Sequence, residues 1–274
     1  MKDLIIVRGG GDLATGTIYK LYQCGFRVLI LEAAHPSAIR RNVAFSEAVY
    51  QGTQTVEDVT CYLADSLSEA CDLLQEKKLT LLVDPEGTSI SQLKPMAVVD
   101  AILAKKNLGT RKDMAPITIA LGPGFLAGQD VDAVIETKRG HNLGRVLWQG
   151  SAAPNTGIPG IIGGYGKERV IHSPAAGILR NICKITDTVQ KDQEIALVET
   201  ENGNVSVKAT INGLLRGLIR DGYPVTKGFK IADIDPRAEE YQNCFTISDK
   251  ARCIAGGVLE AILSQRDGQR KGDL

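Results

Sequence analysis

The chain has no excess of charge of either sign and no long apolar run. Lysines and arginines number 32, and so do aspartates and glutamates, so the formal net charge at pH 7 is +0. This balance argues against nucleic-acid partners and against broad binding to anionic membranes. No apolar run approaches the roughly 20 residues of a membrane span. Because the sequence enters an apolar run at once, with no signal-peptide cleavage pattern, we expect a cytoplasmic protein.

The cysteines do not form a metal-binding pattern. They lie at positions 24, 61, 71, 183, 244 and 253, with no C-x-x-C pair and none at zinc-ligand spacing from a histidine. We therefore predict no metal site, and buried or idle thiols in a reducing compartment. Cys244 is a catalytic candidate, because it follows the polar residues Tyr241, Gln242 and Asn243 and an exposed thiolate there would be reactive.

A glycine-rich turn between two apolar runs dominates the first part of the chain. Leu4–Val7 predicts a strand, a helical pattern follows through Cys24, and Val28–Leu31 predicts a second strand. Gly9, Gly11 and Ala14 in the turn between them fit the G-x-G-x-x-G/A spacing of dinucleotide-binding proteins. Such a turn lets backbone N–H groups approach a phosphate, and the helix behind it adds partial positive charge.

From this pattern we predict a phosphate or nucleotide site, although an empty tight turn in an α/β sheet is the alternative. Glu32 lies where an acidic residue would meet a ribose hydroxyl. Asp12 would repel a pyrophosphate unless it caps the helix or holds a metal, and we expect it to be the N-cap residue before Leu13. The predicted cofactor-binding residues of this segment are Gly9, Gly10, Gly11, Asp12, Leu13, Ala14 and Glu32.

Two further segments add basic or glycine residues to the predicted site. Arg40 and Arg41 follow the second strand, where an arginine can hold a 2′-phosphate; a solvated surface pair is the alternative. The strand Ile117–Leu121 leads into a second glycine turn, and a later loop is strongly basic. Their predicted cofactor-binding residues are Gly122, Gly124, Arg139 and Arg145. His141 in that loop is a candidate general acid or phosphate donor, or a structural histidine.

An internal repeat occupies the region after residue 166. Three pairs of segments match at one constant offset, which is a specific signal. The pairs are Gly177–Arg180 with Gly213–Arg216, Val189–Lys191 with Val225–Lys227, and Ile195–Ala196 with Ile231–Ala232. The pattern resembles the two halves of a biotinyl/lipoyl-type barrel sandwich. The linking stretch Glu199–Asn204 has no lysine, so we expect a structural or docking module and no swinging-arm carrier.

The length and composition predict one or two globular domains. The 274 residues are 43% hydrophobic and 23% charged, which is ordinary for a protein with a sizeable core. We predict an α/β protein in three parts: a Rossmann-like cofactor-binding domain over 1–165, a β-barrel-sandwich repeat module over 166–236, and a C-terminal helix over 237–274 that packs back on the first domain.

Several motifs together resemble the YqeB family of selenium-dependent molybdenum hydroxylase accessory proteins. The matching stretches are Arg8–Gly16, Ile39–Tyr50, Leu121–Phe125, Glu136–His141, Pro154–Gly157, Ser248–Arg252 and Gly256–Ala261. They extend over nearly the whole chain. The chain is also distantly similar to the XdhC/CoxI proteins, which carry molybdenum cofactor and assist its insertion.

The resemblance implies an accessory or maturation factor whose partner is an apo molybdenum hydroxylase. It implies a molybdopterin-type or dinucleotide ligand at the Gly9–Gly11 turn, with Arg139, His141 and Arg145 on phosphate and Cys244 near the metal–sulfur or selenium centre. The family offers no established catalytic residues to transfer.

Two other functions stay open from the sequence. An NAD(P)-dependent oxidoreductase is compatible with the glycine turn, where Glu32 favours NAD and Arg40 and Arg41 favour NADP; however, no tyrosine–lysine or histidine–aspartate proton relay stands out. The second of these functions is a non-enzymatic scaffold that docks a partner through the repeat. The sequence does not decide whether the chain is an enzyme or forms a homo-oligomer.

Overall fold

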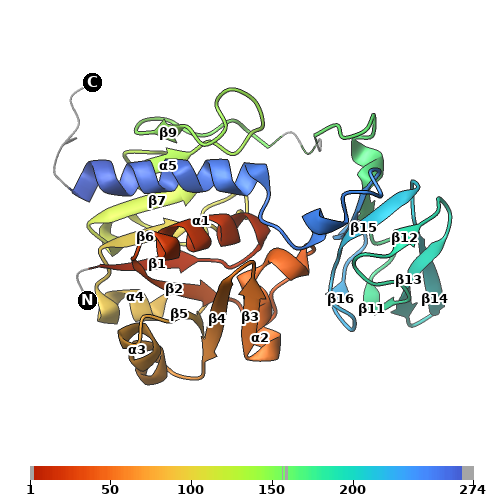
Figure 1. The fold of residues 1–274 in the computed structure, drawn as a ribbon, viewed down its shortest axis with the longest axis horizontal. Helices are drawn as coiled ribbons and strands as arrows, with labels where there is room; N and C mark the ends of the chain where they lie inside the picture. The colour runs from red at the N-terminus through yellow and green to blue at the C-terminus, as the bar shows by residue number, and fades with distance from the viewer. Residues whose placement is uncertain (1–2, 156, 158–159, 267–274) are drawn as a thin grey trace. The chain divides into compact units, whose positions relative to one another are not determined.

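The computed structural model describes residues 3–155, 157 and 160–266 of the chain. Its contacts divide the chain into two compact units. The sheet unit comprises Met1–Pro36, Ala44–Asn155 and Ile247–Leu274, and the repeat unit comprises Ser37–Val43 and Thr156–Thr246. Figure 1 labels the elements of both units. No helix of the described part of the chain is long and apolar enough to span a membrane.

The sheet unit is built on a nine-stranded mixed sheet in the order β3-β4-β5-β2-β1-β6-β7-β8-β9. All neighbours pair in parallel except β3 with β4 and β8 with β9, which are antiparallel at the two edges. The central strand β1 is buried at every residue, as expected of an apolar run covered on both faces. The strands are β1 (Leu4–Arg8), β2 (Arg27–Glu32), β3 (Thr53–Val56), β4 (Val59–Ala64), β5 (Leu79–Val83), β6 (Ala97–Asp100), β7 (Ile117–Leu121), β8 (Ala133–Ile135) and β9 (Val146–Leu147).

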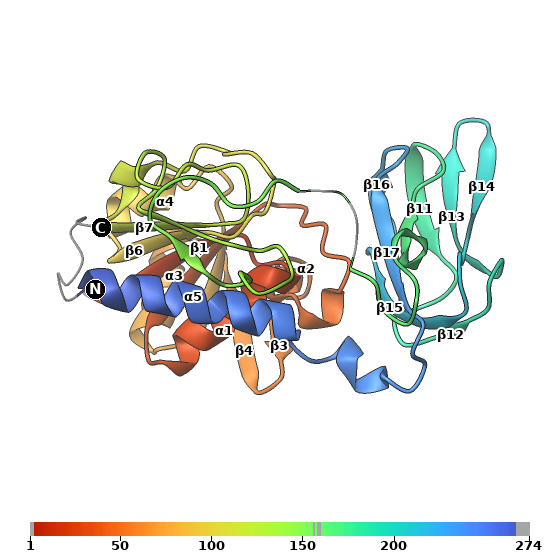
Figure 2. The same cartoon turned by 90° about the horizontal axis from the view of Figure 1, so that it is seen from above.

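Two helices distant in sequence pack side by side in the sheet unit, as both views show (Figures 1 and 2). A Cβ atom on Gly16 of α1 would lie 2.7 Å from the Cβ of Ala251 on α5, and one on Gly257 of α5 would overlap the carbonyl oxygen of Gly144. Glycine therefore permits this close approach. The helices are α1 (Asp12–Gln23), α2 (Ala48–Gln51), α3 (Leu67–Gln75), α4 (Thr88–Leu93) and α5 (Asp249–Arg266), with 3-10 turns η1 (Arg41–Val43), η2 (Phe45–Glu47), η3 (Lys112–Met114), η4 (Lys167–Arg169) and η5 (Tyr241–Cys244).

The repeat unit contains two four-stranded antiparallel sheets, in the orders β10-β17-β15-β12 and β14-β13-β11-β16. Their inner faces share one core, which includes Leu179 and Leu215. The strands are β10 (Val170–His172), β11 (Gly177–Asn181), β12 (Thr188–Val189), β13 (Glu194–Thr200), β14 (Gly203–Lys208), β15 (Gly213–Leu218), β16 (Pro224–Val225) and β17 (Lys230–Asp235).

The sequence repeat appears in this unit as matched strands. Gly177 corresponds to Gly213 at an offset of 36 positions (213 − 177 = 36), and the same offset relates β10 to the end of β14, β11 to β15, β12 to β16 and β13 to β17. Both sheets then have the same order of equivalent strands. Each short strand pairs with the long strand of the other half, β12 with β15 and β16 with β11, so the halves are interlocked.

The predicted fold is wrong as stated. A Rossmann-like domain requires helical crossovers on both faces of a parallel sheet, whereas this sheet is mixed and a 3-10 turn is the sole helical element between β6 and β7. The predicted barrel-sandwich module is replaced by two separate antiparallel sheets, and the unit that holds them also includes Ser37–Val43. The sequence pattern missed the edge hairpin β3–β4, whose first strand is largely exposed and has no apolar run.

Candidate ligand site at the carboxyl edge of the sheet

The predicted glycine turn lies where β1 ends. Strands β1, β6, β7 and β8 run in parallel, so the segments that follow them meet at one edge of the sheet, the usual place for ligands in open α/β sheets. Predicted residues lie in three of these segments: Gly9, Gly10 and Gly11 after β1, Gly122 and Gly124 after β7, and Arg139 and Arg145 after β8.

Gly9 and Gly10, the first two glycines of the turn, pack closely against other parts of the protein. Gly9 has φ +93°, and a Cβ there would lie 3.1 Å from the carbonyl group of Ala101. The Gly10 carbonyl oxygen accepts the N–H of Ser46 at 2.9 Å. A Cβ on Gly10 would lie 3.0 Å from that Ser46 nitrogen. Neighbouring backbone segments are therefore in close contact with this turn and fix its conformation.

Gly11 is different, because it faces open space. It is the N-cap residue of α1, with φ −68° and ψ −178° and no side-chain cap. Apart from Gly11 and its two chain neighbours, no heavy atom of the described residues lies within 4 Å of the position that a Cβ would take. Asp12 is in the first helical turn, so the prediction that it is the N-cap is wrong. A ligand can therefore reach the N-terminus of α1, the positive end of the helix dipole, at Gly11. In the helix that follows, Leu13 is half-buried and Ala14 is buried.

Glu32 supports the glycine turn directly. Its carboxylate accepts the N–H of Gly10 at 2.7 Å and that of Ala33 at 2.8 Å. Burial raises the pKa of Glu32, and these two hydrogen bonds oppose that rise. Both carboxylate oxygens are therefore engaged by the backbone, which differs from the predicted contact with a ribose.

Lys250 on α5 brings a positive charge near this edge, and the sequence patterns did not point to it. Its side chain is half-buried, and no hydrogen bond or ion pair within the described residues engages the ammonium group. Burial, followed by the positive charge of Arg139, lowers the pKa of Lys250, while Asp12 and Glu136 act in the opposite direction. A partly desolvated ammonium of this kind is suited to an anionic ligand.

The basic loop after β8 is held by a buried carboxylate. Glu136 accepts the N–H of Lys138 and the N–H of Ala153, each at 2.8 Å. Arg139 forms an exposed ion pair with Asp249 at 2.9 Å. The three basic side chains predicted to act together do not share a partner: Arg145 donates to Asn142 at 3.4 Å, and His141 is exposed.

The second glycine turn packs against neighbouring loops. A Cβ on Gly122 would lie 2.7 Å from Thr137 Oγ1, and one on Gly124 would lie 2.7 Å from the backbone nitrogen of Lys106. Both glycines have positive φ, +76° and +112°. Protein atoms thus occupy the space that a ligand would need at these two glycines.

Arg8, Thr110 and Asp100 form a buried series of hydrogen bonds near this edge, which the sequence patterns did not connect. Arg8 Nη1 donates to Thr110 Oγ1 at 2.6 Å, and Thr110 Oγ1 donates to Asp100 Oδ2 at 2.6 Å. Burial raises the pKa of Asp100, against its hydrogen bonds and the charge of Arg8. These hydrogen bonds join the ends of β1 and β6 to the loop around Thr110, so they have a structural role.

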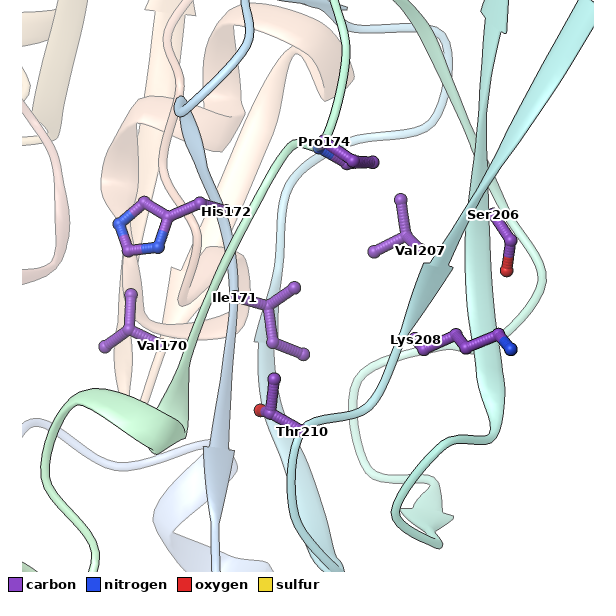
Figure 3. Close-up of a pocket in the computed structure, with 8 residues that line it drawn as sticks. All are labelled: Val170, Ile171, His172, Pro174, Ser206, Val207, Lys208 and Thr210. Carbon is purple, nitrogen blue, oxygen red and sulfur yellow. The ribbon is translucent and has the colours of Figure 1, made fainter.

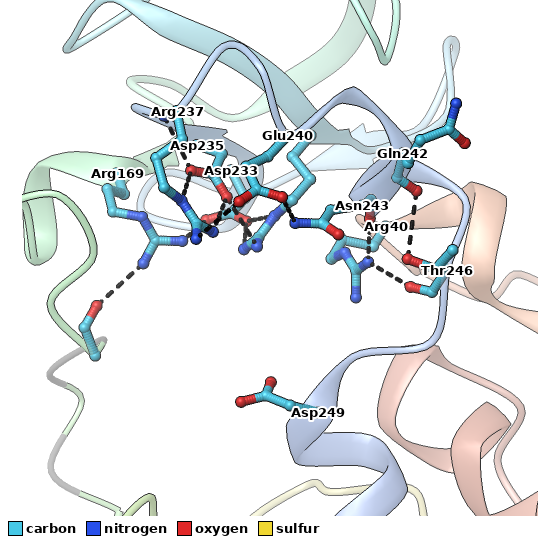
Figure 4. Close-up of polar contacts among 12 residues, drawn as sticks. Arg40, Arg169, Asp233, Asp235, Arg237, Glu240, Gln242, Asn243, Thr246 and Asp249 are labelled. Carbon is cyan, nitrogen blue, oxygen red and sulfur yellow. Dashed lines mark hydrogen bonds and ion pairs between the residues drawn. The ribbon is translucent and has the colours of Figure 1, made fainter.

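The adjacent arginines predicted to bind a 2′-phosphate belong to the repeat unit. Arg40 donates to the carbonyl oxygens of Asn243 at 2.7 Å and Thr246 at 3.1 Å, as Figure 4 shows. Arg41 Nε donates to the carbonyl oxygen of Leu218 at 2.8 Å. Both guanidinium groups thus hold backbone carbonyls of the repeat unit, and these contacts do not favour the predicted phosphate contact.

The structure also corrects the expectation for Cys244. Its side chain is 1% exposed within the core of the repeat unit. Burial raises the pKa of Cys244, although the charges of Arg40 and Arg216 act against the rise. The prediction of an exposed, reactive thiolate at Cys244 is therefore wrong. Among the described residues, no group of three or more histidine, cysteine, aspartate or glutamate side chains could hold a metal ion.

A pocket of about 290 Å³ lies in the repeat unit between β10 and β14 (Figure 3). Its lining consists of pairs related by the repeat: Val170 with Ser206, Ile171 with Val207, His172 with Lys208, and Pro174 with Thr210. The pocket therefore lies on the approximate two-fold axis of the repeat. None of the predicted site residues lines it.

Comparison with solved structures gives weak likenesses. The ectoine utilization protein EutE (DoeB) from Ruegeria pomeroyi has a TM-score of 0.24 and 10% identity, covering 84% of this chain and 56% of that one. An aspartoacylase family protein from Mesorhizobium loti has a TM-score of 0.28 and 10% identity, covering 86% and 85%. A succinylglutamate desuccinylase from Silicibacter has a TM-score of 0.26 and 12% identity, covering 85% and 84%. At such TM-scores these likenesses carry no argument about fold or activity.

Comparison of sequences identifies a relative. No family model matches the chain. It is 52% identical over 260 residues to the uncharacterized protein YqeB of Escherichia coli K12, and the match covers 95% of this chain and 47% of that protein. The chain thus spans about half the length of the curated relative that it matches. Over its own length, the chain belongs to the YqeB family.

Proposed function

We propose that the chain binds a phosphate-bearing cofactor, of the molybdopterin or dinucleotide class, at the Gly9–Gly11 turn and serves as an accessory protein for a molybdenum hydroxylase. The observation that carries the proposal is the open position at Gly11. Gly11 is the N-cap of a 12-residue helix that follows a central strand, and beyond its chain neighbours no described residue has a heavy atom within 4 Å of where a side chain would begin. Backbone N–H groups and the helix dipole make such a position favourable for phosphate.

The residues present fit the phosphate portion of such a cofactor. Phosphate oxygens would accept the N–H groups of the first turn of α1, and the Lys250 ammonium would supply a charge that Asp12 partly opposes. The phosphate would thus replace some of the water around a partly desolvated cation. No residue is assigned to the metal portion, because the described residues hold no candidate ligand group.

The accessory role rests on the motifs shared with the YqeB family and not on the site geometry. The geometry gives less support to nicotinamide recognition, since Glu32 already accepts two backbone N–H groups and Arg40 and Arg41 bind carbonyl oxygens. We therefore keep the oxidoreductase as an outcome of the test and do not propose it as a second function.

Native mass spectrometry against NAD, NADP, ATP, molybdopterin and its cytosine dinucleotide tests the proposal. Gly11→Asp should abolish binding, because it places a side chain and a negative charge in the open approach. Asp is a favourable N-cap at this backbone conformation, so the variant should fold normally. Gly256→Asp is the matched control, since Gly256 on α5 also faces open space. Lys250→Met should weaken binding by about tenfold, equivalent to about 1.4 kcal/mol.

Selective binding of a pterin species that Gly11→Asp removes and Gly256→Asp leaves intact supports the proposal. Binding of a nicotinamide nucleotide alone would support the oxidoreductase instead. Affinity that is unchanged in Gly11→Asp would place the ligand elsewhere and refute the site.

A further inference from the structure

The loop 101–110, which follows β6, has both of its ends at Arg8. The N–H of Ala101 donates to the Arg8 carbonyl oxygen at 2.8 Å, and the Arg8 guanidinium donates to Thr110 Oγ1 at 2.6 Å. Asn107 braces the second end, since its side-chain oxygen accepts the N–H of Thr110 at 2.8 Å. The base of the loop is therefore fixed. Compact surface loops whose ends lie close together are frequently functional.

The tip of the loop, Leu103–Lys106, lacks such support. Among the described residues, no hydrogen bond or ion pair involves the tip. Its residues 104–106 are exposed, and Leu103 is half-buried. The tip rests on the second glycine turn, because a Cβ on Gly124 would lie 2.7 Å from the backbone nitrogen of Lys106. Close packing, and not hydrogen bonding, thus holds the tip in place.

The backbone of the tip is also strained. Leu103 and Lys105 have φ +60° and +63°, in the left-handed region that residues with a Cβ rarely adopt. Lys94 in the same unit is left-handed too, with φ +46°, but its N–H donates to the carbonyl oxygen of Ile90 at 3.0 Å. Strain of this kind persists where the surroundings impose it, and it clusters at ligand clamps and switch segments. With no hydrogen bond to impose its conformation, the tip can leave it at little cost.

The loop lies next to the place where a sheet of this kind binds ligands. The chain adds β2 on one side of β1 and adds β6, β7 and β8 on the other, so the strand order reverses between β1 and β6. Ligands of open α/β sheets bind outside the carboxyl ends of the strands at such a switch point. Gly9 and Ala101 are in contact there. From Ala101 to Lys105 an extended chain spans up to about 14 Å, so the tip can reach the first glycine turn.

The tip carries charge that the first glycine turn lacks. Lys105 and Lys106 are adjacent and exposed, and no ion pair among the described residues engages them. A lysine ammonium on its flexible stem can follow a phosphate group. At the turn itself, the charge of Lys250 is partly opposed by that of Asp12. A pyrophosphate group carries several negative charges, so two further cations would strengthen its binding.

We propose that the tip Leu103–Lys106 is a strap that leaves the second glycine turn and closes over a phosphate group bound at the Gly9–Gly11 turn, where Lys105 and Lys106 neutralise its charge. The inference rests on the proposed phosphate site and adds a conformational step and two binding residues to it. The ligand favours the closed arrangement because only that arrangement brings the lysines to the phosphate. Without a ligand, packing on Gly124 keeps the strap open.

Limited trypsin digestion of the full chain, with and without inorganic pyrophosphate, tests the closure. Trypsin cleaves after lysine, and exposed loop tips are preferred sites of cleavage. Pyrophosphate should slow cleavage after Lys105 and Lys106 at least about fivefold, because the closed strap is less accessible. Cleavage after the exposed Lys77, in the same unit, is the internal control and should not change. Amide NMR of Gly11 reports in parallel whether pyrophosphate occupies the turn.

A charge variant tests the binding residues. Lys105→Gln combined with Lys106→Gln should weaken pyrophosphate binding about tenfold, and both positions are exposed, so the variant should fold normally. Lys77→Gln combined with Lys78→Gln is the matched control. It removes the same charge from an adjacent lysine pair that precedes β5, at the opposite edge of the sheet.

A Gly11 shift together with slower cleavage after Lys105 and Lys106, weaker binding by the tip variant and unchanged binding by the control supports the proposal. A Gly11 shift with unchanged cleavage, or with unchanged affinity in the tip variant, refutes the strap and leaves the phosphate site intact. Absence of both the shift and the protection refutes the two together. Protection that persists in Gly11→Asp would mean that the loop holds the ion by itself, which overturns closure over the turn.

Discussion

The ion pairs Arg180–Glu199 and Arg216–Asp235 occupy equivalent positions in the two halves of one repeat, but only the second is buried. The first pair is about half exposed, whereas the side chain of Asp235 is 0% exposed. Exposed pairs contribute about 0–1 kcal/mol, while breaking a buried pair costs about 3–5 kcal/mol. The comparison teaches that an arginine–carboxylate pair at equivalent positions can be nearly neutral or essential, depending on how far it is buried.

The buried aspartates of the second half also form additional ion pairs with arginines. Asp233 pairs with Arg169 at 3.2 Å and with Arg216, and Asp235 pairs with Arg237 at 2.9 Å. Figure 4 shows Arg169, Asp233, Asp235 and Arg237 gathered in one cluster. Each buried carboxylate thus meets more than one guanidinium, as is needed when charges lose their water. The exposed half carries Leu197 where this cluster has Asp233.

The largest expected effect comes from breaking the buried cluster. Asp233→Ala should lower the free energy of unfolding by about 3–5 kcal/mol, because it leaves Arg169 and Arg216 buried with less compensation. Glu199→Ala removes the exposed pair of the first half and should lower the free energy of unfolding by less than about 1 kcal/mol. Urea denaturation of both variants measures the difference. Equal losses in the two variants would show that burial does not set the worth of these pairs.

An intermediate effect should be the same in both halves. A Cβ on Gly177 would overlap the carbonyl oxygen of Glu199, and one on Gly213 would overlap that of Asp235. Alanine at either position should therefore lower the free energy of unfolding by about 1–3 kcal/mol, the usual range for overpacking. Urea denaturation of the two variants checks this. A loss of stability in Gly213→Ala alone would contradict the shared backbone geometry.

A smaller effect should appear as a pH dependence. Burial by itself would raise the pKa of Asp235, but the hydrogen bonds from Arg237 and the charges of Arg216 and Arg237 lower it below its ordinary value. A lowered pKa stabilises the folded state above the unfolded-state pKa, about 3.9, and this stability is lost as pH falls through the folded pKa. Unfolding free energies of the wild type and Asp235→Asn between pH 7 and pH 3 measure it. The wild type should lose more stability over this range, and parallel curves would contradict the assignment.

Local patterns in the sequence predicted local structure well. The glycine turn between β1 and α1 and the matched strands of the repeat follow from residue spacing. Ser248 precedes the last helical pattern, and its Oγ accepts the N–H of Ala251 at 3.2 Å, as a serine before a helix can. Such features depend on residues that are near in sequence.

Features that depend on distant partners could not be predicted. Arg40 and Arg41 follow a strand as phosphate-binding arginines do, but their acceptors are carbonyl oxygens about 180 to 200 positions away. Lys250 lies in the family-matching stretch Ser248–Arg252, but nothing in that stretch marks it as a ligand-binding residue, and only the packing of α5 on α1 brings it near Asp12. Cys244 lies in a polar stretch yet is buried, because the fold around it, and not its neighbours in sequence, decides its exposure.

The most direct test of the proposed phosphate site is backbone amide NMR of the full chain during titration with inorganic pyrophosphate and then with the cytosine dinucleotide of molybdopterin. The account predicts saturable shifts of the Gly11, Asp12 and Leu13 amide signals, which are absent in Gly11→Asp and retained in Gly256→Asp. Saturable shifts confined to other residues, or no shifts with either compound, would contradict a phosphate site at this turn.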